Sequence, residues 1–79
     1  MSAPLSYLGT ITIRQGDAKT EATGTRYGMS DAFSGRYWGL DPQVTLHPGI
    51  ATIRFHDRLL SDAVLTRVAP DSGHFAKAS

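Results

Sequence analysis

The chain has 79 residues, eight basic and seven acidic side chains, and no cysteine. This length suits one domain, the lack of cysteine excludes disulfides and thiolate metal sites, and a formal net charge of +1 is unlike the basic balance of nucleic-acid-binding modules. We expect a single β domain over residues 1–79 in a reducing, cytoplasmic compartment. No run approaches the roughly 20 apolar residues that span a bilayer, so we expect no membrane segment.

The first half of the chain shows the clearest strand pattern. Alternating apolar and polar residues over 7–14 predict a strand whose inward face carries Ile11 and Ile13. After a turn around Gly16, residues 19–27 are predicted to return as the second strand of a hairpin. Small residues share one face of that strand, and Gly24 is the predicted site of a bulge or bend.

The remaining elements are shorter. A loop over 28–31 precedes a predicted third strand over 32–40, and further strands are predicted over 43–46 and 50–55. Residues 59–68 are predicted as the last strand because β-branched residues favour it. Apolar residues recur at every fourth position there, so a short helix is the alternative.

The pattern as a whole predicts an all-β fold, a small five- to six-stranded antiparallel barrel or sandwich. Turn signals recur every eight to twelve residues, which is typical of both architectures. Residues 70–79 begin with turn-forming residues and continue without any alternation of apolar and polar residues, so we expect a flexible tail. An open sheet would leave strand edges that another chain could pair with.

A near-repeat is the most distinctive motif of the chain: Thr25-Arg26-Tyr27-Gly28 and Gly35-Arg36-Tyr37-Trp38-Gly39. Pairing of the second and third strands would bring its two copies together. The motif predicts a partner-binding patch of Arg26, Tyr27, Arg36, Tyr37 and Trp38. The rings and guanidinium groups could instead stack nucleic-acid bases or fill the core.

Motifs for catalysis and metal binding are weak. His56 and Asp57 are adjacent, but neighbours in a strand point to opposite faces. The spacings of His47, His56 and His74 match no short metal motif, and no nucleophile elbow or complete phosphate-binding loop occurs. We therefore predict no catalytic residue, no metal and no cofactor.

The segment Phe33-Ser34-Gly35-Arg36-Tyr37-Trp38-Gly39 resembles a motif of a small actinobacterial β domain of unknown function that often follows flavin monooxygenases. That domain opens with a Tyr-x-Gly strand, to which Tyr7-Leu8-Gly9 is similar. Its central motif also contains a His and a final Arg that this chain lacks. The resemblance implies an all-β accessory fold and no established catalytic residue.

These features favour a non-catalytic protein-interaction or oligomerisation module that binds through a strand edge or an arginine and aromatic surface. An accessory or phage-encoded protein would suit such a module. A single-stranded nucleic-acid-binding barrel is the first alternative. A small-molecule-binding domain or small enzyme that uses His56 and Asp57 is the second, and it requires both side chains to lie in a deep pocket.

Overall fold

The computed structural model describes residues 4–29 and 31–78, which form six antiparallel strands. The strands are β1 (Leu5–Gln15), β2 (Ala18–Met29), β3 (Ala32–Trp38), β4 (Gly49–Phe55), β5 (Leu60–Val68) and β6 (Ser72–Lys77).

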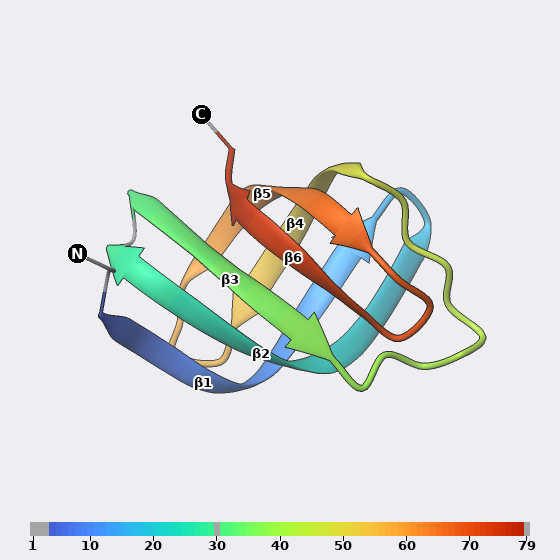
Figure 1. Cartoon of the computed structure of the whole chain (residues 1–79), viewed down its shortest axis with the longest axis horizontal. Helices are drawn as coiled ribbons and strands as arrows, with labels where there is room; N and C mark the ends of the chain where they lie inside the picture. Colours follow the sequence, from blue (N-terminus) through green and yellow to red (C-terminus); the bar gives the residue numbers. More distant parts are fainter. Residues whose placement is uncertain (1–3, 30, 79) are drawn as a thin grey trace.

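The six strands close into a barrel in the order β1-β2-β3-β6-β5-β4, with β4 pairing back to β1 (Figure 1). The first three strands follow one another as hairpins, and the chain then crosses to place β4 beside β1, which is a Greek-key connection. This confirms the all-β fold and decides for a barrel. Each described strand has a neighbour on both sides, so the expected open sheet with free edge strands is absent from the described residues, although β1 pairs with β4 only over 11–14 and β2 pairs with β3 only within 23–29.

The barrel interior is filled by alternate residues of each strand. Ile11 and Ile13 of β1 are fully buried, as the period of the sequence predicts, and β4 buries Ala51, Ile53 and Phe55. The full buried apolar set is Ile11, Ile13, Ala22, Phe33, Tyr37, Leu40, Leu46, Ala51, Ile53, Phe55, Ala63, Leu65 and Phe75.

Small residues make room for large ones inside this narrow barrel. A Cβ atom on Gly24 would lie 2.5 Å from Cδ1 of Ile11. One on Gly35 would lie 2.6 Å from the Phe75 ring. Both distances are too short for real Cβ contacts, so these positions need glycine for packing. The expected irregularity at Gly24 is absent from the β1–β2 register, which shifts instead between Leu5 and Tyr7.

The expected strand over 43–46 is wrong. These residues belong to the loop between β3 and β4, because their backbone groups find no neighbouring strand once six strands have closed the barrel. Asp41 accepts a hydrogen bond from the Gln43 N–H at 2.9 Å, which makes a local turn. Leu46 is still buried, so the loop supplies an apolar side chain to the core.

The expected flexible tail is also wrong for the described part of 70–79. Residues 72–77 form β6, which pairs with both β3 and β5, and Phe75 is only 2% exposed. Residues 60–68 are a strand, as predicted, and not the alternative helix. The expected loop over 28–31 is shorter, because β2 reaches Met29; Ser30 lies outside the described residues.

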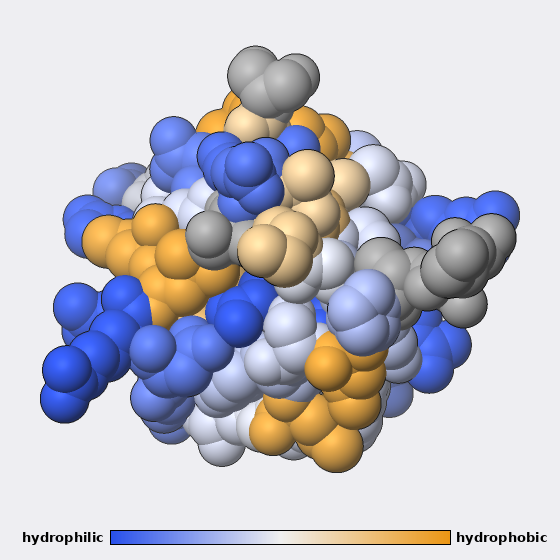
Figure 2. Space-filling view, turned by 90° about the vertical axis from the view of Figure 1, so that its left-hand side faces the viewer, coloured by the Kyte–Doolittle hydropathy of each residue, from blue (hydrophilic) through white to orange (hydrophobic). Residues whose placement is uncertain are grey.

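Apolar side chains on the outside are dispersed. At the end of the barrel near the N-terminus, Figure 2 shows separate hydrophobic patches between hydrophilic side chains. No helix in residues 4–29 and 31–78 is long and apolar enough to cross a membrane. The exposed large apolar residues are Leu5, Leu8, Met29, Trp38, Ile50 and Leu60.

Candidate functional site: an arginine and aromatic face

The register of β2 and β3 divides the near-repeat between the inside and the outside of the barrel. Tyr27 lies opposite Ser34, and Gly24 lies opposite Tyr37. Directly opposite residues point to the same side of a sheet. Even-numbered residues of β2 therefore point to the same side of the sheet as odd-numbered residues of β3. Corresponding residues of the two copies of the motif, such as Arg26 and Arg36, consequently point to opposite sides.

Arg26 faces the barrel interior and closes one of its ends. Its guanidinium Nη2 donates to Asp57 Oδ2 at 2.7 Å, and Nη1 donates to Oδ1 at 3.3 Å. Its Cζ atom lies 4.7 Å from the centre of the Phe55 ring, which is a cation–π contact. The hydrogen bonds from Arg26 hold the pKa of the Asp57 carboxyl below its ordinary value, against a smaller opposing effect of desolvation. Arg26 is thus part of the structure and offers no free charge to a partner.

Tyr37 also faces the interior, where it is 1% exposed. It lies between Gly24 on β2 and Gly73 on β6, and a Cβ atom on Gly73 would come within 2.4 Å of the Tyr37 hydroxyl oxygen. The ring therefore covers a glycine of the neighbouring strand. Burial raises the pKa of this hydroxyl, which has no hydrogen-bond partner among the described residues. Tyr37 cannot belong to an exposed patch.

Tyr27, Arg36 and Trp38 remain on the outside. Arg36 is exposed, Trp38 is 40% exposed and Tyr27 is half-buried. The Arg36 backbone N–H donates to the Thr25 hydroxyl at 3.3 Å, which fixes this part of β3 against β2. The structure therefore brings together three of the five predicted residues and places Arg26 and Tyr37 in the interior.

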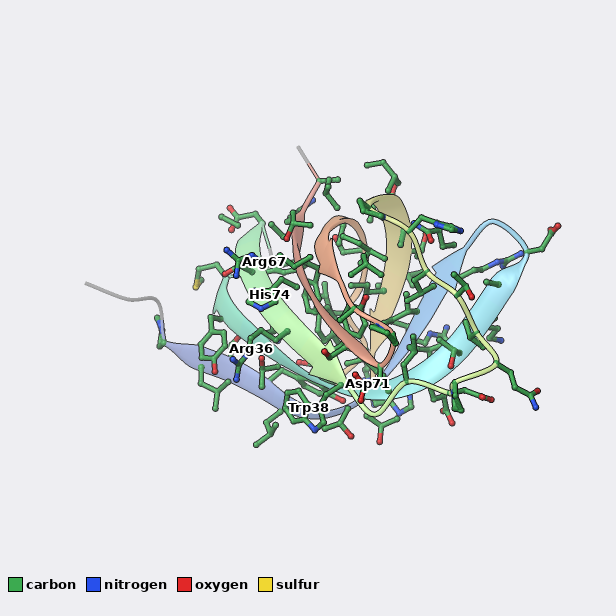
Figure 3. All side chains as sticks on the ribbon, turned by 45° about the vertical axis from the view of Figure 1, so that its right-hand side comes forward. Arg36, Trp38, Arg67, Asp71 and His74 are labelled. Atoms are coloured by element: carbon green, nitrogen blue, oxygen red, sulfur yellow. The ribbon has the colours of Figure 1, made fainter. Side chains whose placement is uncertain are left out.

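Two residues that the sequence reasoning missed, Arg67 and His74, join this surface. His74 of β6 lies opposite Arg36 on one side and Arg67 on the other. Figure 3 shows Arg67, His74, Arg36 and Trp38 along one side of the barrel, with Asp71 at the Trp38 end. We call Tyr27, Arg36, Trp38, Arg67 and His74 the arginine–aromatic face.

A β-bulge puts Arg67 on this face. The register of β5 with β6 shifts between Leu65 and Arg67, which leaves Thr66 as the extra residue. Leu65 points inward, so regular alternation would also turn Arg67 inward. The bulge reverses the alternation, exposes Arg67 and lets Val68 pack against the core. Two consecutive polar residues, Thr66 and Arg67, are the sequence signal that could have revealed it.

The surface is hollowed beside Trp38. A shallow depression of about 290 Å³ is lined by Arg36, Tyr37, Trp38, Ser72, Gly73 and His74. Since Tyr37 and Gly73 face inward, their backbone forms its floor and the other side chains form its walls. Its open shape suits contact with a surface side chain of another molecule.

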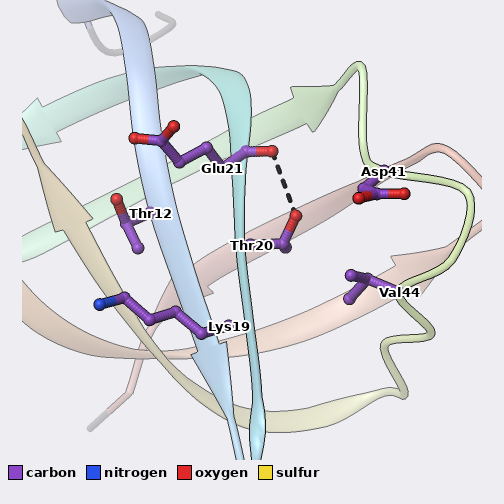
Figure 4. Close-up of a pocket in the computed structure, with 6 residues that line it drawn as sticks. All are labelled: Thr12, Lys19, Thr20, Glu21, Asp41 and Val44. Carbon is purple, nitrogen blue, oxygen red and sulfur yellow. Dashed lines mark hydrogen bonds between the residues drawn. The ribbon is translucent and has the colours of Figure 1, made fainter.

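Tyr27 lines a separate depression of about 390 Å³ together with Lys77 of β6. Three further depressions contain none of the five predicted residues. One of about 580 Å³ lies beside β2 and the β3–β4 loop, with Lys19 and Glu21 directed to one side of β2 and Thr20 to the other (Figure 4). The Thr20 hydroxyl donates to the Glu21 carbonyl at 3.3 Å. This depression is open and is lined by side chains of opposite charge, so it lacks the features of a defined binding site.

The geometry does not support the alternative that uses His56 and Asp57. Both residues are exposed on the turn between β4 and β5, and the Asp57 carboxylate faces Arg26. His56 Nε2 instead lies 3.3 Å from the Thr12 hydroxyl oxygen. In residues 4–29 and 31–78, no group of three or more His, Asp or Glu side chains is placed to hold a metal ion.

We found no match for this chain among models of protein families, among curated proteins or among solved structures. The resemblance to the small actinobacterial β domain therefore stays a prediction based on the residues around Gly35-Arg36-Tyr37-Trp38.

Proposed function

We propose that this protein is a non-catalytic protein-interaction module that binds its partner through the arginine–aromatic face. One observation carries the proposal: exposed Trp38 lies two residues from exposed Arg36 on β3, and exposed Arg67 lies farther along the same side of the barrel. Tryptophan, tyrosine and arginine are the residues that contribute most to protein interfaces. The resemblance to an accessory β domain agrees with such a role.

The two arginines are available to a partner. Within the described part of the chain, the one ion pair shorter than 4 Å joins Arg26 to Asp57. Arg36 and Arg67 are therefore not neutralised by a described carboxylate. Burial of an exposed ring next to such cations is the arrangement expected at the centre of an interface, where an apolar anchor is surrounded by polar contacts.

Closure of the barrel favours binding through side chains over addition of a strand. Each described strand has a neighbour on both sides, although β1 pairs with β4 only over 11–14 and β2 pairs with β3 only within 23–29, so little backbone is left for addition of a partner strand. Recognition would therefore depend on side chains that project from the outer surface of β3, β5 and β6. The same face could also meet its own copy, which makes self-association one form of the proposed interaction.

The test compares capture of a partner by variants of the full chain. Trp38→Ala removes the ring from the arginine–aromatic face, and Leu60→Ala removes an apolar side chain that is 58% exposed opposite Arg54 of β4. Tagged wild-type protein and both variants are purified from the native host, and thermal unfolding confirms that each is folded. Light scattering of the purified proteins measures self-association.

We expect a protein, or a second copy, to associate with the wild type and with Leu60→Ala but not with Trp38→Ala. Association that survives Trp38→Ala would contradict the proposal. So would a nuclease-sensitive complex, which would favour single-stranded nucleic acid as the ligand. A monomer from which no protein co-purifies would contradict it as well.

A further inference from the structure

We infer that the partner presents an acidic segment, with at least two carboxylates beside an apolar or aromatic side chain. This inference rests on the proposed function and specifies the chemistry of the partner. It follows from the distribution of charge over the arginine–aromatic face.

The two strands at the centre of the face carry no acidic residue. Neither β3 nor β6 contains Asp or Glu, although seven such residues occur in the chain. All seven lie outside these strands: Asp31 and Asp71 lie at the turns before β3 and β6, and Asp62 is exposed near the start of β5, where it accepts a hydrogen bond from Thr52. The face therefore has cationic side chains at its centre and acidic ones only at its ends.

The two arginines of the face lie in one row that crosses β3, β6 and β5. Arg36 and Arg67 are the cross-strand neighbours of His74 on its two sides. Neighbouring strands are about 4.8 Å apart, so the backbones of the two arginines lie roughly 10 Å apart. Because this separation is about one Debye length at physiological salt, their mutual repulsion is weak and both charges remain available. Carboxylates from a partner would be attracted to both arginines, and the same arginines would repel partners of positive charge.

Trp38 adds the apolar requirement. It lies two residues beyond Arg36 on β3, which is about 6.7 Å along the strand. Its ring borders the depression of about 290 Å³ in which Ser72 offers a hydroxyl group. An apolar side chain of the partner can pack on the ring while neighbouring carboxylates reach Arg36 and Arg67.

The charge balance favours an acidic protein segment over a nucleic acid. The face has two permanent positive charges, and the formal charge of the chain is +1. Binding of nucleic acid takes most of its strength from many phosphate contacts, each provided by a Lys or Arg. Two contacts with an aromatic anchor suit a short protein segment better.

The experiment selects peptides from a displayed random library on the immobilised full chain. Affinity of the best peptides is then measured by the fluorescence of Trp38, the one tryptophan of the sequence. The variants are Arg36→Gln, Arg67→Gln and their double variant. Arg54→Gln is the matched control, because Arg54 is an exposed arginine of β4 opposite Thr12 of β1, away from β3 and β6.

We expect the selected peptides to contain at least two Asp or Glu residues next to an apolar one. Each arginine substitution on the face should weaken binding about two- to fivefold, and the double variant about tenfold or more, as for exposed ion pairs. Arg54→Gln should leave the affinity within about twofold of the wild type. Replacement of the peptide's acidic residues by amides should weaken binding at least as much as the double variant.

The outcomes separate this inference from the proposed function. The selected peptides could be neutral or basic and still bind less tightly to Trp38→Phe than to the wild type in calorimetry. That result would overturn the inference of an acidic partner but would leave the proposed binding face in place. Peptides that bind independently of Trp38, Arg36 and Arg67 would overturn both. An oligothymidine of about 12 nucleotides that binds more tightly than any selected peptide would overturn the inference in favour of nucleic acid.

Discussion

Replacement of Asp57 by asparagine would leave the guanidinium group of Arg26 at the end of the barrel without its counter-charge. The Arg26 side chain is 9% exposed and that of Asp57 is 38% exposed. Removal of one partner from a fully buried pair costs about 3–5 kcal/mol, whereas an exposed pair contributes about 0.2–1 kcal/mol. This pair lies between the two cases, so Asp57→Asn should lower the free energy of unfolding by about 2 kcal/mol.

The opposite substitution should cost less. Arg26→Met removes the charge but keeps an unbranched apolar side chain against the Phe55 ring, and Asp57 is exposed enough to be hydrated. We expect a loss of about 1 kcal/mol, mainly from the cation–π contact and the hydrogen bonds. In the double variant the loss should be about 1 kcal/mol smaller than the sum of the two single losses.

The assay is urea unfolding at pH 7, followed by far-ultraviolet circular dichroism and by the fluorescence of Trp38. A loss of about 2 kcal/mol corresponds to a fall in Tm of roughly 8–16 °C for a domain of this size. A loss below about 0.5 kcal/mol for Asp57→Asn would refute the reasoning. So would single losses that simply add in the double variant, because Arg26 would then not depend on Asp57.

Three further predictions concern stability. Gly35→Ala should cost about 2–3 kcal/mol in urea unfolding, because the new methyl group would lie 2.0 Å from the backbone oxygen of Thr25; an unchanged midpoint would contradict the close approach of β2 and β3. Phe75→Ala should cost about 3–5 kcal/mol, whereas a flexible tail would give a loss near zero in the same measurement. Acid should lower the unfolding free energy of the wild type more than that of Asp57→Asn. Since the pKa of Asp57 in the folded protein lies below its ordinary value, the pair with Arg26 stabilises the fold above about pH 4, and this stabilisation is lost as the pH falls through the folded pKa. Unfolding free energies measured between about pH 5 and pH 2 test this, and parallel curves for the two proteins would contradict it.

The all-β architecture could be predicted from the sequence because alternation along β1 and β4 is strong. Ile11 and Ile13 are spaced by two between polar residues, and Ala51, Ile53 and Phe55 repeat the pattern. Closure into a barrel could not be predicted in the same way. It depends on β6, where Phe75 is the one large apolar residue and the small Gly73 is explained only by its neighbours in the barrel, the Tyr37 ring of β3 and the Arg67 backbone oxygen of β5.

The candidate site could be predicted only in part. The near-repeat directed attention to the correct hairpin, but which of its residues are exposed depends on the register of β2 with β3. A register that differed by one residue would have placed Arg26 and Arg36 on the same side of the sheet. Arg67 was missed because a bulge at Thr66 reverses its direction, and His74 was missed because its strand was expected to be a flexible tail.

Nuclear Overhauser contacts between the backbone protons of β3, β6 and β5 are the most direct test of the closed barrel and its binding face. We predict cross-strand contacts of His74 with both Arg36 and Arg67, together with contacts between Ile13 and Ile53 that close the barrel on its other side. Random-coil chemical shifts for residues 72–77 and the absence of these contacts would contradict both the closed barrel and the arginine–aromatic face.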